Sequence, residues 1–307
     1  MNKSEKILPF IYMLLCALPT AFGFGAISAF MLCGVLAAEF VKKSLPHYVT
    51  ALIFTAFLMF FANYGNIYYF VAYFALIAVI SFCIGASIKG KKNLSHIVVS
   101  ASMCAITVFL ILIVYNMRTY NISAVSAIFG IYFETLREAA PLMGDVAPQF
   151  TALISTFEKQ IDQLLPSLII VAGALFSYIS FGIARKIIEK NSPKLDIRPF
   201  FLLRLAPSFT FIFIIADMIS MFMGTNMFFA NASVVLSTLF TVCGISVFDF
   251  YLRAKNINTF FRTVIYVAAF MLIAFTGLFG SLATTVLHFV GIWDSLRPLR
   301  RINSNNF

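Results

Sequence analysis

Charge is the scarcest property of this 307-residue sequence, since Asp, Glu, Lys and Arg together make up only 11% of it. A soluble domain carries about 25% charged residues, whereas 61% of this chain is hydrophobic. So few charges cannot keep a globular surface in water, and they also exclude a disordered chain, which needs low hydrophobicity and high charge. The composition therefore predicts an integral membrane protein.

Residues with catalytic or metal-binding chemistry are also few. The chain has three histidines and five cysteines. The cysteines stand singly within apolar runs, so the sequence offers neither a C-x-x-C pair nor a disulfide framework. It also contains no H-E-x-x-H, G-x-S-x-G or P-loop motif. We therefore expect no enzyme activity, no metal site and no cofactor.

Long apolar runs are what the sequence has in abundance. Breaks at Pro19, around Gly65 and at Gly277 divide the longest runs, and Lys or Arg ends most of them. At about 20 apolar residues per crossing, the runs predict an all-α, polytopic transmembrane helical bundle of about 8–10 spans. We expect one transmembrane domain over residues 1–307, with N-terminal spans in 1–117, an extracytoplasmic segment in 118–164 and C-terminal spans in 165–307.

The basic residues orient this bundle. The formal net charge is +10, and cytoplasmic loops collect Lys and Arg under the positive-inside rule. With a cytoplasmic N-terminus and ten crossings, only Arg118, Arg137 and Lys159 fall outside. Both termini are therefore predicted to be cytoplasmic, in the inner membrane of a bacterium. The basic cytoplasmic loops should attract anionic lipid headgroups, and no nucleic acid is needed to explain the charge.

The predicted extracytoplasmic segment contains one amphipathic pattern. Apolar residues recur at helical spacing along Pro148–Leu165, which predicts a helix with one apolar face. Such a helix usually buries that face against the membrane surface or the bundle. The functional alternative is a lid or a surface for docking a partner.

Two groups of polar residues within the spans are candidates for binding a ligand. Asp217 stands near the middle of its span with Ser220 three residues on. A charge at this depth costs about 2.5–3.5 kcal/mol on insertion scales, so Asp217 is a candidate ligand-binding or coupling group, and otherwise a structural hydrogen-bonded Asp. Tyr68, Tyr69 and Tyr73 would line the mouth of an apolar pocket or form an aromatic belt.

Small residues recur every four positions near the start of the chain, at Ala17, Ala21, Gly25 and Ala29. Such small-xxx-small faces let two helices approach closely. They are candidates for helix packing or for docking on a membrane protein partner. The stretch is also so rich in small residues that the pattern arises easily by composition alone.

The C-terminus supplies a family resemblance. A short apolar helix contains Gly291 and ends at Asp294, and Arg300 follows six residues later. This arrangement resembles the terminal signature of the YybS-type family of uncharacterised bacterial membrane proteins. The expected Trp shortly before Pro207 is absent. Asp294 and Arg300 stand where the last helix leaves the membrane, and an ion pair there would pin the end of the bundle or meet a cytoplasmic partner.

The resemblance also implies a function. YybS-type proteins are distantly similar to the S components of energy-coupling-factor transporters, which bind a small-molecule solute and dock on a membrane coupling subunit. On this likeness the first helices would form the docking face, and the outer segment with the tyrosines would shape the solute site, although this chain is much longer than an S component. The alternative is a non-transporting membrane scaffold or assembly factor with a protein partner, which fits the absence of chemical motifs.

Overall fold

The computed structural model describes most of the chain, namely residues 3–21, 25–62, 67–190, 195–197, 199–223, 226–275, 278–297 and 299–300. These residues form eleven α-helices and two short 3-10 helices, and no strand occurs among them. The predicted all-α fold class is confirmed. The breaks predicted at Gly65 and Gly277 lie outside the described residues.

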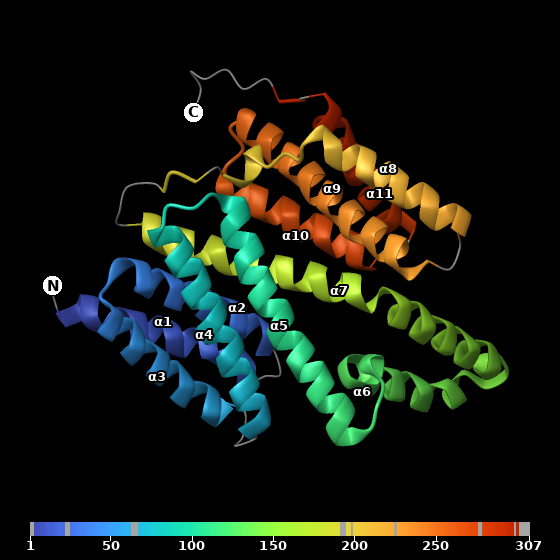
Figure 1. Cartoon of the computed structure of the whole chain (residues 1–307), viewed down its shortest axis with the longest axis horizontal. Coiled ribbons are helices and arrows are strands. Elements are labelled where there is room, and N and C mark those ends of the chain that lie inside the picture. The colour runs from blue at the N-terminus through green and yellow to red at the C-terminus, as the bar shows by residue number, and fades with distance from the viewer. Residues whose placement is uncertain are drawn as a thin grey trace. The chain divides into compact units, whose positions relative to one another are not determined.

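The helices gather into two compact units, Met1–Ile197 and Arg198–Phe307. Unit 1, in blue to yellow-green in Figure 1, contains α1 (Lys3–Ala21), α2 (Gly25–Lys42), α3 (Leu45–Ala62), α4 (Ile67–Lys89), α5 (Leu94–Tyr120), α6 (Ala124–Ala139), η1 (Ala140–Val146) and α7 (Ala147–Glu189). Unit 2 contains η2 (Phe200–Leu202), α8 (Pro207–Met223), α9 (Met227–Ala254), α10 (Thr259–Phe275) and α11 (Leu278–Leu296). The single domain predicted from the sequence, with internal divisions at residues 117 and 164, stays a prediction.

The lengths of the apolar helices agree with a membrane protein. Four described segments are long and apolar enough to cross a bilayer: Phe70–Lys89, Leu94–Tyr120, Ala147–Glu189 and Met227–Ala254. Four shorter apolar helices accompany them, over Pro9–Pro19, Leu45–Phe61, Pro207–Phe222 and Thr259–Ala269. The cytoplasmic placement of the two termini stays a prediction.

Helix α2 forms the centre of unit 1, where it packs against α1, α3, α4 and α7. Its contact with α7 needs a glycine, because a Cβ at Gly34 would lie 2.6 Å from the Cβ of Ile183 and 2.8 Å from the carbonyl oxygen of Ser180. The end of α2 is tied to the end of α7 by Lys42, whose ammonium group donates to the carbonyl of Ile187. This close packing makes α2 and α7 the frame on which the rest of unit 1 is arranged.

The long helix α7 has 43 residues, which corresponds to about 64 Å at 1.5 Å per residue and is about twice the thickness of a bilayer's hydrocarbon core. The amphipathic helix predicted at Pro148–Leu165 and the span predicted from Leu165 are therefore one continuous helix. Pro166 lies inside it and removes one backbone donor. A proline in this position bends a helix more often than it ends one when packing holds both sides of the helix.

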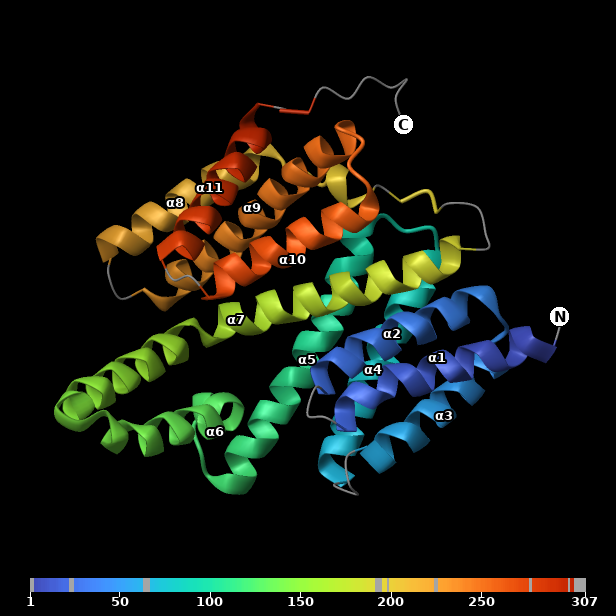
Figure 2. The ribbon, with the colours of Figure 1, turned by 180° about the vertical axis from the view of Figure 1, so that it is seen from behind.

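The first half of α7 turns back against α6, and we call α6, η1 and residues 147–165 the outer hairpin. Val125 and Phe133 of α6 share a buried apolar cluster with Ile154 and Leu165 of α7. Figure 2 shows α6 beside this part of α7. The predicted apolar face is thus partly covered by α6, whereas Leu153 and Phe157 on the same stretch stay more than half exposed. The sequence had not indicated this contact with α6.

Two glycines bring α9 and α11 together at the centre of unit 2. A Cβ on Gly244 would lie 1.9 Å from the carbonyl oxygen of Leu287, and a Cβ on Gly291 would lie 1.9 Å from that of Phe240. Real Cβ contacts do not occur at this distance, so only glycine permits the crossing. The reciprocal contact fixes the register of α11 on α9 and thereby the position of the C-terminal end of α11.

We expect Gly244→Ala to destabilise unit 2, because the added methyl group meets backbone atoms that cannot rotate away. Overpacking of this kind costs about 1–3 kcal/mol. Thermal unfolding of the purified protein in mild detergent measures the effect. Gly182→Ala is the matched control, since a Cβ there meets nothing within 4 Å. Equal melting temperatures for the two variants would contradict the close α9–α11 contact.

Candidate functional site

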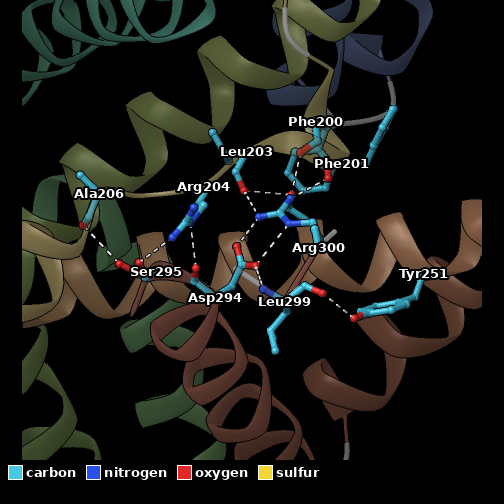
Figure 3. Close-up of polar contacts among 11 residues, drawn as sticks. Phe200, Phe201, Leu203, Arg204, Ala206, Tyr251, Asp294, Ser295, Leu299 and Arg300 are labelled. Atoms are coloured by element: carbon cyan, nitrogen blue, oxygen red, sulfur yellow. Dashed lines mark hydrogen bonds and ion pairs between the residues drawn. The ribbon is translucent and has the colours of Figure 1, made fainter. Parts of the chain in front are cut away.

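The most highly connected side chain in the described structure is Arg300, which is 5% exposed. Its guanidinium donates to both carboxylate oxygens of Asp294, the longer bond being 3.4 Å. It also donates to the carbonyls of Phe201 (2.6 Å) and Leu203 (2.7 Å) and to the hydroxyl of Ser246 (2.9 Å). A guanidinium has five N–H donors, and all five are used here (Figure 3).

The partner carboxylate is held from a second direction. Asp294 is completely buried and accepts a further hydrogen bond from the backbone N–H of Leu299 (3.1 Å). Arg204 donates to the carbonyls of Asp294 (2.8 Å) and Ser295 (3.0 Å), which are among the last carbonyls of α11. Because these carbonyls have no helical donor, Arg204 both satisfies them and places positive charge at the helix C-terminus.

These contacts supply hydrogen-bond donors to backbone carbonyls in the segment that leads into α8. Residues 203–206 have no helix or strand, so their carbonyls need donors from other segments. The single hydroxyl proton of Ser246 is shared between the carbonyls of Phe200 (2.7 Å) and Leu203 (3.1 Å), and the hydroxyl of Ser295 donates to the carbonyl of Ala206 (3.2 Å). We call Arg204, Ser246, Asp294, Ser295 and Arg300 the arginine clamp.

A second ion-pair group lies in the same unit around Asp249, which is 3% exposed. Its carboxylate accepts from Arg253 (2.9 Å) and Arg262 (3.4 Å). The guanidinium of Arg253 also lies 4.5 Å from the ring centre of Phe201, a cation–π distance. Phe201 therefore contacts both groups, since its carbonyl binds Arg300.

The residues carried over from the family signature are thus brought together. Gly291 allows α11 to approach α9, which places Asp294 and Arg300 beside Ser246 of α9. All these polar atoms are directed inward at one another and at backbone carbonyls. This geometry indicates a structural role, which is to hold the C-terminal end of α11 in place. It leaves the guanidinium no N–H group with which to bind an outside ligand.

Unit 1 contains a cavity of about 400 Å³, which we call the outer cavity. It lies between α2, α4, α5, α6 and α7. Its lining residues are Ala29, Ala72, Tyr73, Leu76, Phe109, Leu112, Ile113, Asn116, Ala127, Ile128, Phe129, Leu165, Leu168, Ile169, Ala172 and Phe176. The outer hairpin supplies part of this wall, so the segment that the sequence marked as extracytoplasmic covers the cavity.

The candidate tyrosines and small residues fall in unit 1. Tyr73 lines the outer cavity, whereas the side chains of Tyr68 and Tyr69 lie outside the described residues, as does that of Ala21. Ala17 is buried. A Cβ at Gly25 would lie 3.0 Å from the Tyr73 hydroxyl, so this glycine makes room for the tyrosine.

Ala29 is completely buried beside the cavity and forms part of its wall. The described members of the small-residue pattern thus take part in packing within unit 1. Their docking role stays a prediction.

Asp217 lies near the middle of an apolar helix, as its sequence context indicated. It lies on α8 in unit 2, is exposed, and accepts a hydrogen bond from the hydroxyl of Ser233 on α9 (2.8 Å). Ser220 is partly buried on the same helix. Neither residue lines the outer cavity, and the role of Asp217 as a coupling group stays a prediction.

Several residues of both sites were missed from the sequence. Arg204 was counted only as a topology-determining charge, and Ser246 is one hydroxyl among many in an apolar run. Asn116 and the α6 wall were also missed. The signal for α6 was present, because Ser123 caps it through the N–H of Ser126 (3.1 Å) and apolar residues follow at helical spacing.

Comparisons with known proteins point to one family. The family model described as "Predicted membrane protein (DUF2232)" matches residues 10–294. The chain is also similar to "Uncharacterized protein YybS" of Bacillus subtilis (strain 168), with 23% identity over 195 residues, which is 59% of this chain and 63% of the relative. The match therefore spans less than two thirds of that relative's length. No solved structure shows a significant match.

We expect Arg300→Ala to lower the stability of unit 2 sharply, because it leaves the carboxylate of Asp294 buried without its charge partner. Removing one partner of a buried pair costs about 3–5 kcal/mol. Arg300→Lys should restore only part of this, since an ammonium has three donors where the guanidinium has five and lacks the planar fork that binds both carboxylate oxygens. Chemical unfolding in mixed micelles gives the free energies.

The control is the exposed pair of Arg137 and Glu158, in which the Arg137 side chain is 48% exposed. Arg137→Ala should change stability by less than about 1 kcal/mol. An Arg300→Ala variant that unfolds like Arg137→Ala would show that the clamp does not hold the unit together.

Proposed function

The chain belongs to the DUF2232 family of predicted membrane proteins, and from this premise we propose that it is a multi-pass, solute-binding protein of a bacterial cytoplasmic membrane. In this proposal the outer cavity is the binding site, and binding leads to transport together with a membrane protein partner. The resemblance to the S components of energy-coupling-factor transporters supports the same class of function.

The outer cavity is the observation that carries this proposal. Its volume of about 400 Å³ lies within the range of about 300–1,000 Å³ that is typical of small-molecule sites. Five helices converge on it, namely α2 and the consecutive helices α4, α5, α6 and α7. The cavity opens onto the surface of unit 1, where its lining residues Ile128 and Leu168 are each 38% exposed, so a ligand can enter it.

The predicted topology supports access to this cavity from outside. Asn116 lines the cavity near the end of α5, and Arg118, two residues later, is one of the three basic residues predicted outside. Ala127, Ile128 and Phe129 come from α6, within the predicted extracytoplasmic segment. The cavity therefore lies towards the outer end of unit 1, where a solute-capturing protein needs its site.

A scaffold that binds a protein partner is the second candidate function, and one observation favours it. The outer hairpin exposes large apolar side chains, with Ile131 at 80%, Tyr132 at 70% and Leu142 at 88% exposure. Exposed apolar residues outside the spans mark partner or membrane-surface contacts when they lie together. In this reading the hairpin would be the docking element, and the cavity would hold no solute.

Native mass spectrometry of the full chain, extracted gently from its own cells, tests the solute-binding proposal. We expect a small molecule at a ratio near one per chain. Ala172→Phe should remove most of it, because Ala172 lines the cavity and a phenyl ring placed there fills the site. The protein should stay folded, since the ring enters open space.

Ala152→Phe is the matched control, because it adds the same ring to the same helix at an exposed position that does not line the cavity. We expect it to retain the bound molecule. A wild-type protein that carries a stable protein partner and no small molecule would contradict solute binding and support the scaffold.

A further inference from the structure

We infer that the outer cavity takes an uncharged single-chain amphiphile, a ligand that is mostly hydrocarbon with one hydrogen-bonding head group. This inference rests on the proposed function and names the class of ligand. It comes from the chemistry, length and polarity gradient of the cavity wall.

The chemistry of the wall excludes a charged ligand. All but two of the described lining residues are apolar, and none is charged. A carboxylate or ammonium moved into such a place loses its hydration and gains no counter-charge, which costs far more than burial of a neutral polar group. Phosphates and carboxylates are bound elsewhere by arginines, lysines or helix N-termini, and the described lining offers no such cation.

The two polar residues differ in what they offer a ligand. The hydroxyl of Tyr73 lies close to α2, at 3.0 Å from where a Cβ of Gly25 would be, so this residue is engaged at the boundary between helices. Asn116 contributes an amide with two donors and one acceptor, placed towards the outer end of the wall. One amide in an apolar wall matches one hydroxyl or ester group on the ligand.

The cavity is elongated along the helix axes. Its wall on α5 runs from Asn116 to Phe109, which is about 10 Å at 1.5 Å per residue. On α7 the wall runs from Leu165 to Phe176, or about 16 Å by the same rise. Phe109 and Phe176 meet edge to face, with ring centres 6.5 Å apart, at the inner end. The site is therefore a slot with an aromatic floor and a polar mouth.

This polarity gradient runs in the same direction as that of a lipid in the outer leaflet, whose chain points to the bilayer centre and whose head lies at the interface. An amphiphile can thus reach the slot from the bilayer or from the outer aqueous phase without turning over. Both sources supply the same chemistry, and the ligand would lie with its head at Asn116 and its chain end at the aromatic floor.

Photolabelling of the full chain in lipid nanodiscs tests this. Two probes of equal chain length are used, a medium-chain fatty alcohol with a diazirine at its far end and the corresponding fatty acid as its anion. We expect the alcohol to label peptides around Phe109 and Phe176, and the acid to label them at least fivefold less. Delivery from the nanodisc lipid and from a cyclodextrin complex in water shows which source is faster.

Variants connect this labelling to the slot. Ala172→Phe should reduce labelling around Phe109 at least fivefold, whereas Ala152→Phe should leave it unchanged. Asn116→Leu should weaken retention of the alcohol about fivefold, since it removes one hydrogen bond in an apolar surrounding. Labelling of lipid-facing positions such as Ile111, which is 63% exposed, serves as the internal reference in every sample.

The outcomes separate this inference from the proposed function. Equal labelling by the acid and the alcohol would overturn the uncharged class and leave solute binding in place. No labelling by either probe, with a native solute that Ala172→Phe still removes, would also overturn the ligand class alone. No labelling together with no bound solute would overturn both.

Discussion

A backbone carbonyl that is buried in a membrane protein must find its donor within the protein, and unit 2 is arranged around this constraint. The chain between Pro199 and Pro207 lacks α-helix, and each carbonyl that is buried there without a donor would cost about 1–3 kcal/mol. Arg300 supplies donors to two of these carbonyls while its charge is balanced by Asp294. The positions of α8, α9 and α11 are linked through this one guanidinium, because its acceptors come from the segments that adjoin or form all three.

Unit 1 differs from unit 2 in that it contains an apolar cavity beside its closely packed helices. Small residues bring α2 close to α4 at Gly85 and to α7 at Gly34, and α5 packs directly against α7, while the outer hairpin holds α6 against both of them. The space beneath it is the outer cavity. Unit 2 thus satisfies every donor of its buried arginine, whereas unit 1 keeps an apolar space, which is the binding site that we propose.

The sequence was informative where local chemistry decides the structure. Apolar runs of sufficient length become helices, and Asp294 with Arg300 could be singled out through the resemblance to the YybS-type family, at a helix end where an ion pair was one of the two roles expected. The sequence could not place Asp217, because α8 is apolar almost all round and such a helix does not show which side packs on its neighbour. It could not reveal the cavity either, since the cavity depends on how α6 crosses other helices. Nothing in the sequence distinguishes Ala172, which lines the cavity, from the other alanines of the chain.

The crossing of Gly244 and Gly291 brings two main chains together without side chains between them, so that the Cα hydrogens of one helix point at the carbonyls of the other. Contacts of the Cα–H···O type contribute about 0.5–1 kcal/mol each and do not depend on side-chain shape. The close approach of α9 and α11 therefore depends on the absence of two side chains. Around this crossing the helices still bury side chains such as Phe240, so a change in the size of those residues carries the usual cost of altered core packing.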